Sequence, residues 1–141
     1  MQVKHYQQLI AWRKAIALVT EVYSLTARFP REETYGLTTQ LRRAAVSIPS
    51  NIAEGQGRAT KGEFVQFLGH ARGSLFEVET QLAISRNLGH IATEEQECLS
   101  DALNELGRIL NGLIASLQQK QVHRLATSHW PLSYWLLTCP S

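Results

Sequence analysis

Polar side chains gather around a proline in the nine-residue segment Ser-Ile-Pro-Ser-Asn-Ile-Ala-Glu-Gly that begins at Ser47. Proline removes a backbone donor and breaks or bends a helix, so Ser47, Ser50, Asn51 and Glu54 could surround a small polar pocket at Pro49. A structural role is favoured: Ser50 and Asn51 bond the backbone groups that Pro49 frees, and Glu54 pairs with a nearby arginine. We therefore predict a structural bend here and no catalytic residue.

No other combination of residues points to a metal or catalytic centre. A di-metal carboxylate bundle needs Glu-x-x-His pairs, and the sequence contains none. Cys98 and Cys139 form no Cys-x-x-Cys pattern, and nucleophile-elbow, P-loop and dinucleotide-binding motifs are absent. His70 falls inside a predicted helix near its core face, where a partly buried or solvent-facing histidine is favoured over a ligand or base. The sequence thus predicts no metal, no cofactor and no enzymatic activity.

Basic residues flank the proline-containing segment and form the candidate nucleic-acid-binding surface: Arg42, Arg43, Arg58, Lys61 and Arg72. Clustered cations can hold phosphates. The first 72 residues contain ten Lys or Arg against five Glu, whereas the rest contain four against seven acidic residues. The net charge of the chain is only +2. A solvated or ion-paired surface is the favoured alternative.

Apolar residues three and four positions apart predict the helices that position these side chains. The first stripe predicts a helix from about residue 6 to 28, ended by Pro30, with a core face of Leu9, Trp12, Ile16, Val19, Tyr23 and Thr26. The second stripe consists of Leu37, Leu41, Ala44, Ala45, Ile48 and Ile52. Pro49 lies within the same segment.

Capping patterns mark the two later helices. After a flexible break predicted at Gly55-Gln-Gly57, Thr60 and Glu63 form a capping box for a third helix, which Gly89 ends. Its core stripe is Phe64, Phe67, Leu68, Ala71, Leu75, Val78, Leu82 and Leu88. A second capping box, Thr93-Glu-Glu-Gln96, begins a fourth helix with the stripe Leu99, Ala102, Leu106, Ile109, Leu113 and Leu117. Four helices of about 20 residues predict an all-α, antiparallel up-down four-helix bundle over residues 1–122.

Two features concern the surface of this bundle. Gly69 and Gly73 predict close helix packing, either within the bundle or across subunits. The C-terminal tail, residues 123–141, ends in Trp130-Pro-Leu-Ser-Tyr-Trp-Leu-Leu-Thr-Cys139, which is either a strap docked on a bundle or a ragged end. No signal peptide and no run of about 20 apolar residues is present, so we expect a cytoplasmic protein without a membrane partner.

Three motifs together resemble a known family. The run from Tyr35 to Gly55, the pair Glu63-Phe64 and the segment Ala71-Arg-Gly-Ser-Leu-Phe-Glu77 are similar to the 23S rRNA-intervening-sequence protein family, over about residues 8–118. The resemblance implies an antiparallel four-helix bundle that assembles into closed homopentamers, with no enzymatic activity attributed to it. It also points to accessory proteins that work beside retroelement reverse transcriptases and bind nucleic acid through a basic surface. His70 stands where the family pattern is usually apolar, and the tail has no counterpart.

The sequence therefore favours a non-catalytic, oligomeric four-helix-bundle scaffold. We expect the protein to bind copies of itself and form a homopentamer. We expect it to engage RNA or DNA, or a nucleic-acid enzyme, through the basic residues of the second helix and the following loop. The alternative is a structural adaptor for another protein without nucleic-acid binding. In that case the acidic start of the fourth helix or the apolar tail is the contact.

Overall fold

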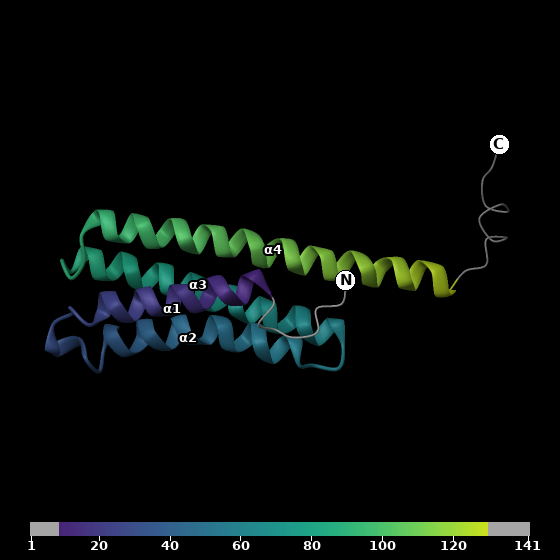
Figure 1. Cartoon of the computed structure of the whole chain (residues 1–141), viewed down its shortest axis with the longest axis horizontal. Helices are drawn as coiled ribbons and strands as arrows, with labels where there is room; N and C mark the ends of the chain where they lie inside the picture. The colour runs from purple at the N-terminus through teal and green to yellow at the C-terminus, as the bar shows by residue number, and fades with distance from the viewer. Residues whose placement is uncertain (1–8, 130–141) are drawn as a thin grey trace.

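The computed structural model describes residues 9–129, with side chains as far as residue 119. Within them lie α1 (Ile10–Thr26), a short 3-10 helix η2 (Arg31–Glu33), α2 (Leu37–Gln56), α3 (Lys61–Asn87) and α4 (Thr93–His129). Consecutive helices run in opposite directions, and α4 continues past the end of the other three (Figure 1). Helix α1 contacts α2 and α4, and α3 contacts the same two helices from the other side. The predicted up-down four-helix bundle is confirmed.

The core is aliphatic and draws on all four helices. Its largest fully buried apolar side chains are Val22, Leu41, Ile48, Ile52, Leu68, Val78, Leu82, Leu103, Leu106 and Leu110. The stripe predicted for α2 is confirmed, with Leu37 only partly buried. The stripe of α4 is rotated, because Leu103, Leu110 and Ile114 are buried where Ala102, Ile109 and Leu113 were expected. Leu88 lies beyond the end of α3 and is 57% exposed, so its predicted core position is wrong.

The core face of α1 differs from the predicted one by about one residue. The buried positions of this helix are Ala11, Ala15, Leu18, Val22, Leu25 and Thr26. Two alanines in that set leave little hydrophobic signal, whereas the larger residues of the predicted stripe attract it. Trp12 and Val19 are partly buried against the core, but Ile16 and Tyr23 are exposed. Helix α1 therefore has a second apolar stripe that points away from the core.

Helix α2 passes through Pro49 without a break. The ring leaves the carbonyl of Ala45 without its usual i+4 amide donor. One turn further on, the Asn51 side chain donates Nδ2–H to the carbonyl of Ser47 at 2.7 Å, and the Ser47 hydroxyl donates to the carbonyl of Ala44 at 2.8 Å. The prediction that Asn51 bonds the backbone group freed by Pro49 is therefore not met, because its side chain bonds the carbonyl of Ser47 and not that of Ala45. Ser50 is exposed and makes no such bond to the described residues.

The close contact between helices lies at a different glycine from the two that the sequence predicts. Gly55 is buried inside α2, where an added Cβ would lie 2.7 Å from Phe67 Cβ and 2.9 Å from Phe64 Cδ2. It is therefore the site of close helix approach and no flexible break. A Cβ on Gly69 or Gly73 would meet nothing within 4 Å, so of the two predicted alternatives close packing within the bundle is wrong, and packing across subunits stays a prediction.

The helix ends follow the capping rules with one shift. Thr60 and Glu63 form the predicted capping box of α3, and Gly89 adopts a positive φ of 78° after this helix. At the start of α4, Ala92 stands before the first helical residue, and its amide donates to Glu95 Oε1 at 3.0 Å. The predicted Thr93–Gln96 box is thus wrong by one position. The helix also extends to His129, so the predicted domain boundary at 122 lies inside it; residues 130–141 of the predicted tail lie outside the described residues.

Candidate functional site

An apolar groove runs along the surface between α1 and α2. It encloses about 260 Å³ and is lined by Trp12, Ile16, Val19, Val46, Pro49, Ser50 and Ala53. Ile16 is 40% exposed and Val46 39% exposed, and Tyr23 on the same stripe of α1 is 43% exposed. Outside Ser50 the lining is hydrocarbon and indole. Pro49, inside the continuous helix α2, therefore borders an apolar surface and not the polar pocket that catalysis would need.

Arg42 and Arg43 lie at one end of this groove and differ in what they contact. The guanidinium of Arg42 lies 4.4 Å from the centre of the Tyr23 ring, and its Nε–H donates to Thr26 Oγ1 at 2.8 Å. These contacts fix Arg42 against α1. Arg43 points to solvent on the outer face of α2 and has no ion pair or hydrogen bond with another described residue.

Arg58 and Lys61 lie at the opposite end of the bundle, on the turn between α2 and α3. Arg58 pairs with Glu54 at 2.7 Å, as predicted for Glu54, and its guanidinium lies 4.6 Å from the centre of the Phe67 ring. Lys61 begins α3 and is exposed. Sixteen positions separate Arg42 from Arg58, which corresponds to about 24 Å along a helix.

Arg72 faces in a third direction. It donates to Asn111 Oδ1 on α4 at 2.9 Å and lines a groove between α3 and α4 together with Arg108. The five predicted basic residues therefore do not form one cluster. They divide into a pair at one end, a pair at the other end, and one residue on the α3–α4 side.

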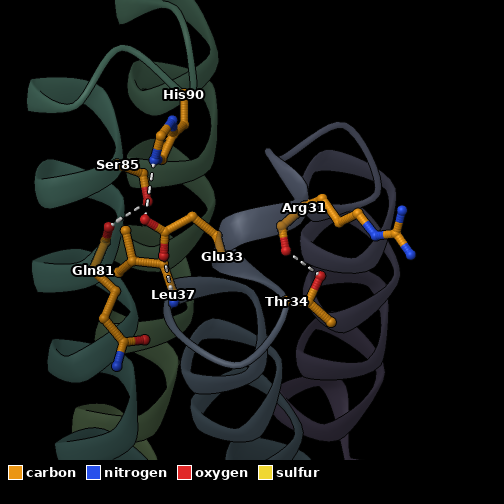
Figure 2. Close-up of polar contacts among 7 residues, drawn as sticks. All are labelled: Arg31, Glu33, Thr34, Leu37, Gln81, Ser85 and His90. Atoms are coloured by element: carbon orange, nitrogen blue, oxygen red, sulfur yellow. Dashed lines mark hydrogen bonds and ion pairs between the residues drawn. The ribbon is translucent and has the colours of Figure 1, made fainter.

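A polar contact joins the two loops at the Arg42 end of the bundle (Figure 2). His90 Nε2 lies 3.4 Å from Glu33 Oε1, and the His90 ring packs against Phe29. The amide of Leu37 donates to Glu33 Oε2 at 3.0 Å. This backbone bond, more than His90, lowers the pKa of Glu33 below its ordinary value. The arrangement closes the end of the bundle and is structural.

Another hollow lies between α1 and α4, with a volume of about 430 Å³. Arg28 crosses it to pair with Glu95, and Cys98 lies exposed at its edge. The amide of Ala92, followed by Arg28, lowers the pKa of Glu95. Across residues 9–119, no three His, Cys, Asp or Glu side chains lie close enough to hold a metal ion.

His70 is exposed, as predicted, and packs edge-on against Phe67 with ring centres 5.7 Å apart. Among the described helices, none combines the length and the hydropathy needed to cross a bilayer.

Sequence reasoning missed the groove between α1 and α2. The signal was present as an excess of large apolar residues on α1, where Ile16 and Tyr23 accompany the core-facing Leu18 and Val22. A helix packed on one side of a bundle needs only one apolar stripe. Two stripes on one helix indicate two partners.

Comparisons with known proteins agree with this architecture. A family model described as 23S rRNA-intervening sequence protein matches residues 7–112, and no curated protein matches the sequence. Among solved structures, the chain is similar to a protein of unknown function from the S23 ribosomal protein family of Bacteroides thetaiotaomicron. The TM-score is 0.67 and the identity 19%, over 74% of this chain and 98% of that one. At this identity the structural likeness concerns the fold alone. Because the family model covers most of the four helices, the chain belongs to the 23S rRNA-intervening sequence protein family.

Proposed function

We propose that this protein is a non-catalytic scaffold that works as a closed oligomer, with five subunits as the expected number. The observation that carries the proposal is the exposed apolar groove between α1 and α2. Ile16 and Val46 line this groove and each leave about two fifths of their surface in water, as does Tyr23 two turns further along α1. Contiguous apolar surface of this kind is typical of sites that bind another macromolecule.

Burial of the groove provides the driving force for assembly. Each square ångström of apolar surface removed from water stabilises a contact by about 25 cal/mol. A ring repeats the contact at every subunit, so a modest contact per subunit still gives a defined assembly. The sequence offers no motif that would direct the same surface to a small-molecule substrate.

Sedimentation equilibrium of the full chain tests the proposal. We expect one defined mass above that of the monomer at micromolar concentration, and Ile16→Asp should lower it, because the new carboxylate would lie in the apolar contact. Ile10→Asp is the matched control: Ile10 is on the same helix and 62% exposed but does not line the groove. Circular dichroism verifies that both variants remain helical. A monomeric unmodified protein would overturn the proposal.

A second candidate function is nucleic-acid binding at the turn between α2 and α3. Arg58 and Lys61 are both exposed there, and a ring would repeat this pair around one rim. Repetition multiplies weak phosphate contacts by avidity, which compensates for a net charge of only +2. Arg43 and Arg72 point elsewhere and do not contribute to this rim.

Binding to mixed single- and double-stranded RNA and DNA probes tests this candidate. Phosphate contacts release counterions, so binding should weaken steeply with salt and show little base preference. Arg58→Glu combined with Lys61→Glu should abolish it, while Arg31→Glu combined with Arg86→Glu, two exposed arginines on other parts of the surface, should change it less. If the unmodified protein binds none of the probes at ~50 mM salt, the nucleic-acid function is rejected and the scaffold's partner is a protein.

A further inference from the structure

The outer face of α3 is a second surface that the bundle does not use. Gly69, Gly73, Thr80 and Ile84 follow one another at helical spacing on the side turned away from the core, with Phe76 beside them. Phe76 is 56% exposed and also lines the groove between α3 and α4. Glycine weakens a helix interior, and no atom of the bundle comes near enough to either glycine to explain its presence by packing within the chain.

This face and the groove between α1 and α2 differ in shape. The groove is concave and apolar, whereas the face of α3 presents one aromatic side chain next to bare glycine backbone. A helix with glycines on its contact face can approach a neighbour closely and place the flanking Phe76 into a hollow. The two surfaces belong to different helices, as a head-to-tail contact between identical subunits requires.

The two surfaces also carry opposite charges without partners. Arg43 lies one turn before Val46 on the exposed side of the groove, and Glu77 lies next to Phe76 on the face of α3. Neither side chain makes an ion pair or hydrogen bond with another described residue, while Glu54, Glu95 and Glu105 are all paired within the bundle.

Arg43 and Glu77 lie at the same level along the bundle. Gly55 of α2 faces Phe64 and Phe67 of α3, which fixes how the two antiparallel helices align. Twelve positions before Gly55 is Arg43, and twelve positions after residues 64–67 is the stretch 76–79, which contains Glu77. Rotation about an axis parallel to the bundle keeps every residue at its level. In such a ring, the Glu77 of one subunit therefore lies at the same level as the Arg43 of the next.

From these observations we infer that the outer face of α3 seats in the α1–α2 groove of a second copy, with Glu77 paired to Arg43 across the contact. The inference rests on the proposed oligomeric function and names the two surfaces that meet. By the same alignment, Val46 lies level with residues 73–76, so the groove receives Gly73 and Phe76. A contact between two different surfaces propagates around a ring, whereas a contact of α3 with itself would stop at a dimer.

Charge reversal tests the pairing. Arg43→Glu and Glu77→Lys should each place like charges across the contact and raise the concentration for half-assembly by roughly tenfold or more. The double variant with both changes restores opposite charges and should recover the mass of the unmodified protein. Arg31→Glu and Glu97→Lys are matched controls, because both residues are exposed and lie on neither surface. Circular dichroism checks the folding of each variant.

Thiol cross-linking identifies the two surfaces independently. With Cys98 and Cys139 replaced by serine, Ser50→Cys and His70→Cys proteins should give cross-linked dimers with a short bis-maleimide only when the two are mixed. A dimer from the His70→Cys protein alone would show that α3 packs on itself and would overturn the inference. Unchanged assembly in both charge-reversed variants, or a double variant that fails to reassemble, would overturn it as well. Each of these three results would contradict the contact between α3 and the groove without contradicting assembly of the unmodified protein. A monomeric unmodified protein would instead reject the scaffold function itself.

Discussion

Replacement of Gly55 by alanine tests the closest helix contact in the bundle. The added Cβ would lie 2.7 Å from Phe67 Cβ, 2.9 Å from Phe64 Cδ2 and 3.3 Å from the carbonyl oxygen of Phe64. Carbon atoms in contact normally stay about 3.5–4.0 Å apart, so α2 and α3 must separate locally. Because Phe67 Cβ is attached directly to the backbone, rotation of a side chain cannot relieve the first of these contacts.

Two opposing effects determine the size of the loss. Overpacking of a core contact destabilises by about 1–3 kcal/mol, and the backbone contact places Gly55→Ala in the upper part of that range. Alanine favours a helix interior over glycine by about 1 kcal/mol. The net loss in free energy of unfolding should therefore be about 1–2 kcal/mol, or roughly 3–6 °C in melting temperature.

Urea unfolding followed by far-ultraviolet circular dichroism measures this loss, at one fixed protein concentration because the proposed assembly would contribute to stability. Gly112→Ala is the matched control: Gly112 is an exposed glycine of α4 with nothing within 4 Å of an added Cβ, so this variant should gain stability. If Gly55→Ala proves as stable as the control, the close α2–α3 contact is not present in solution and the alignment of α2 with α3 loses its support.

Three further predictions concern single polar contacts. Asn51→Ala should cost about 1 kcal/mol because it removes the bond to the Ser47 carbonyl, and an unchanged midpoint of urea unfolding would contradict this role. Thr60→Ala should cost about 1 kcal/mol through loss of the α3 cap, whereas Thr93→Ala, one position inside α4, should leave thermal unfolding nearly unchanged. Glu33 has a pKa lowered from 4.5, chiefly by the amide of Leu37. Its stabilisation is thus present above pH 4.5 and lost as the pH falls through the lowered pKa, so Glu33→Gln should flatten the acid limb of a stability-against-pH curve.

Most of the fold is encoded in local patterns that the sequence displays openly. Leucine and isoleucine at the core positions of α2 and α3 give an apolar period that only a helix satisfies, and the capping box at Thr60 marks where α3 begins. The predicted core face is wrong where small core residues stand next to larger apolar residues in the sequence. On α1 the core positions hold Ala11 and Ala15, so the larger Trp12 and Ile16 shift the apparent stripe.

The candidate site depended more on contacts between helices, which sequence spacing does not reveal. Arg42 and Arg58 are close in sequence but lie at opposite ends of the bundle, because the second helix keeps its course through Pro49 and holds them apart. Gly55 and Gly73 are both helical glycines, and only the position of the neighbouring helix shows that Gly55 faces Phe67 while Gly73 faces open space.

An apolar stripe has the same sequence pattern whether its own chain or another copy covers it, since the hydrophobic effect depends on the area removed from water and not on its source. Assembly surfaces are therefore found as the apolar positions that remain exposed after the bundle has packed. Besides Ile10, Tyr35 and Leu88 near the helix ends, such positions are Ile16, Tyr23 and Val46 on α1 and α2, and Phe76 and Ile84 on α3. A bundle with one such group of exposed apolar residues could bury it by pairing with a second copy through the same surface. Two unlike groups of this kind are both buried in the proposed head-to-tail ring, because each packs against the other, whereas two separate self-contacts would give a dihedral assembly.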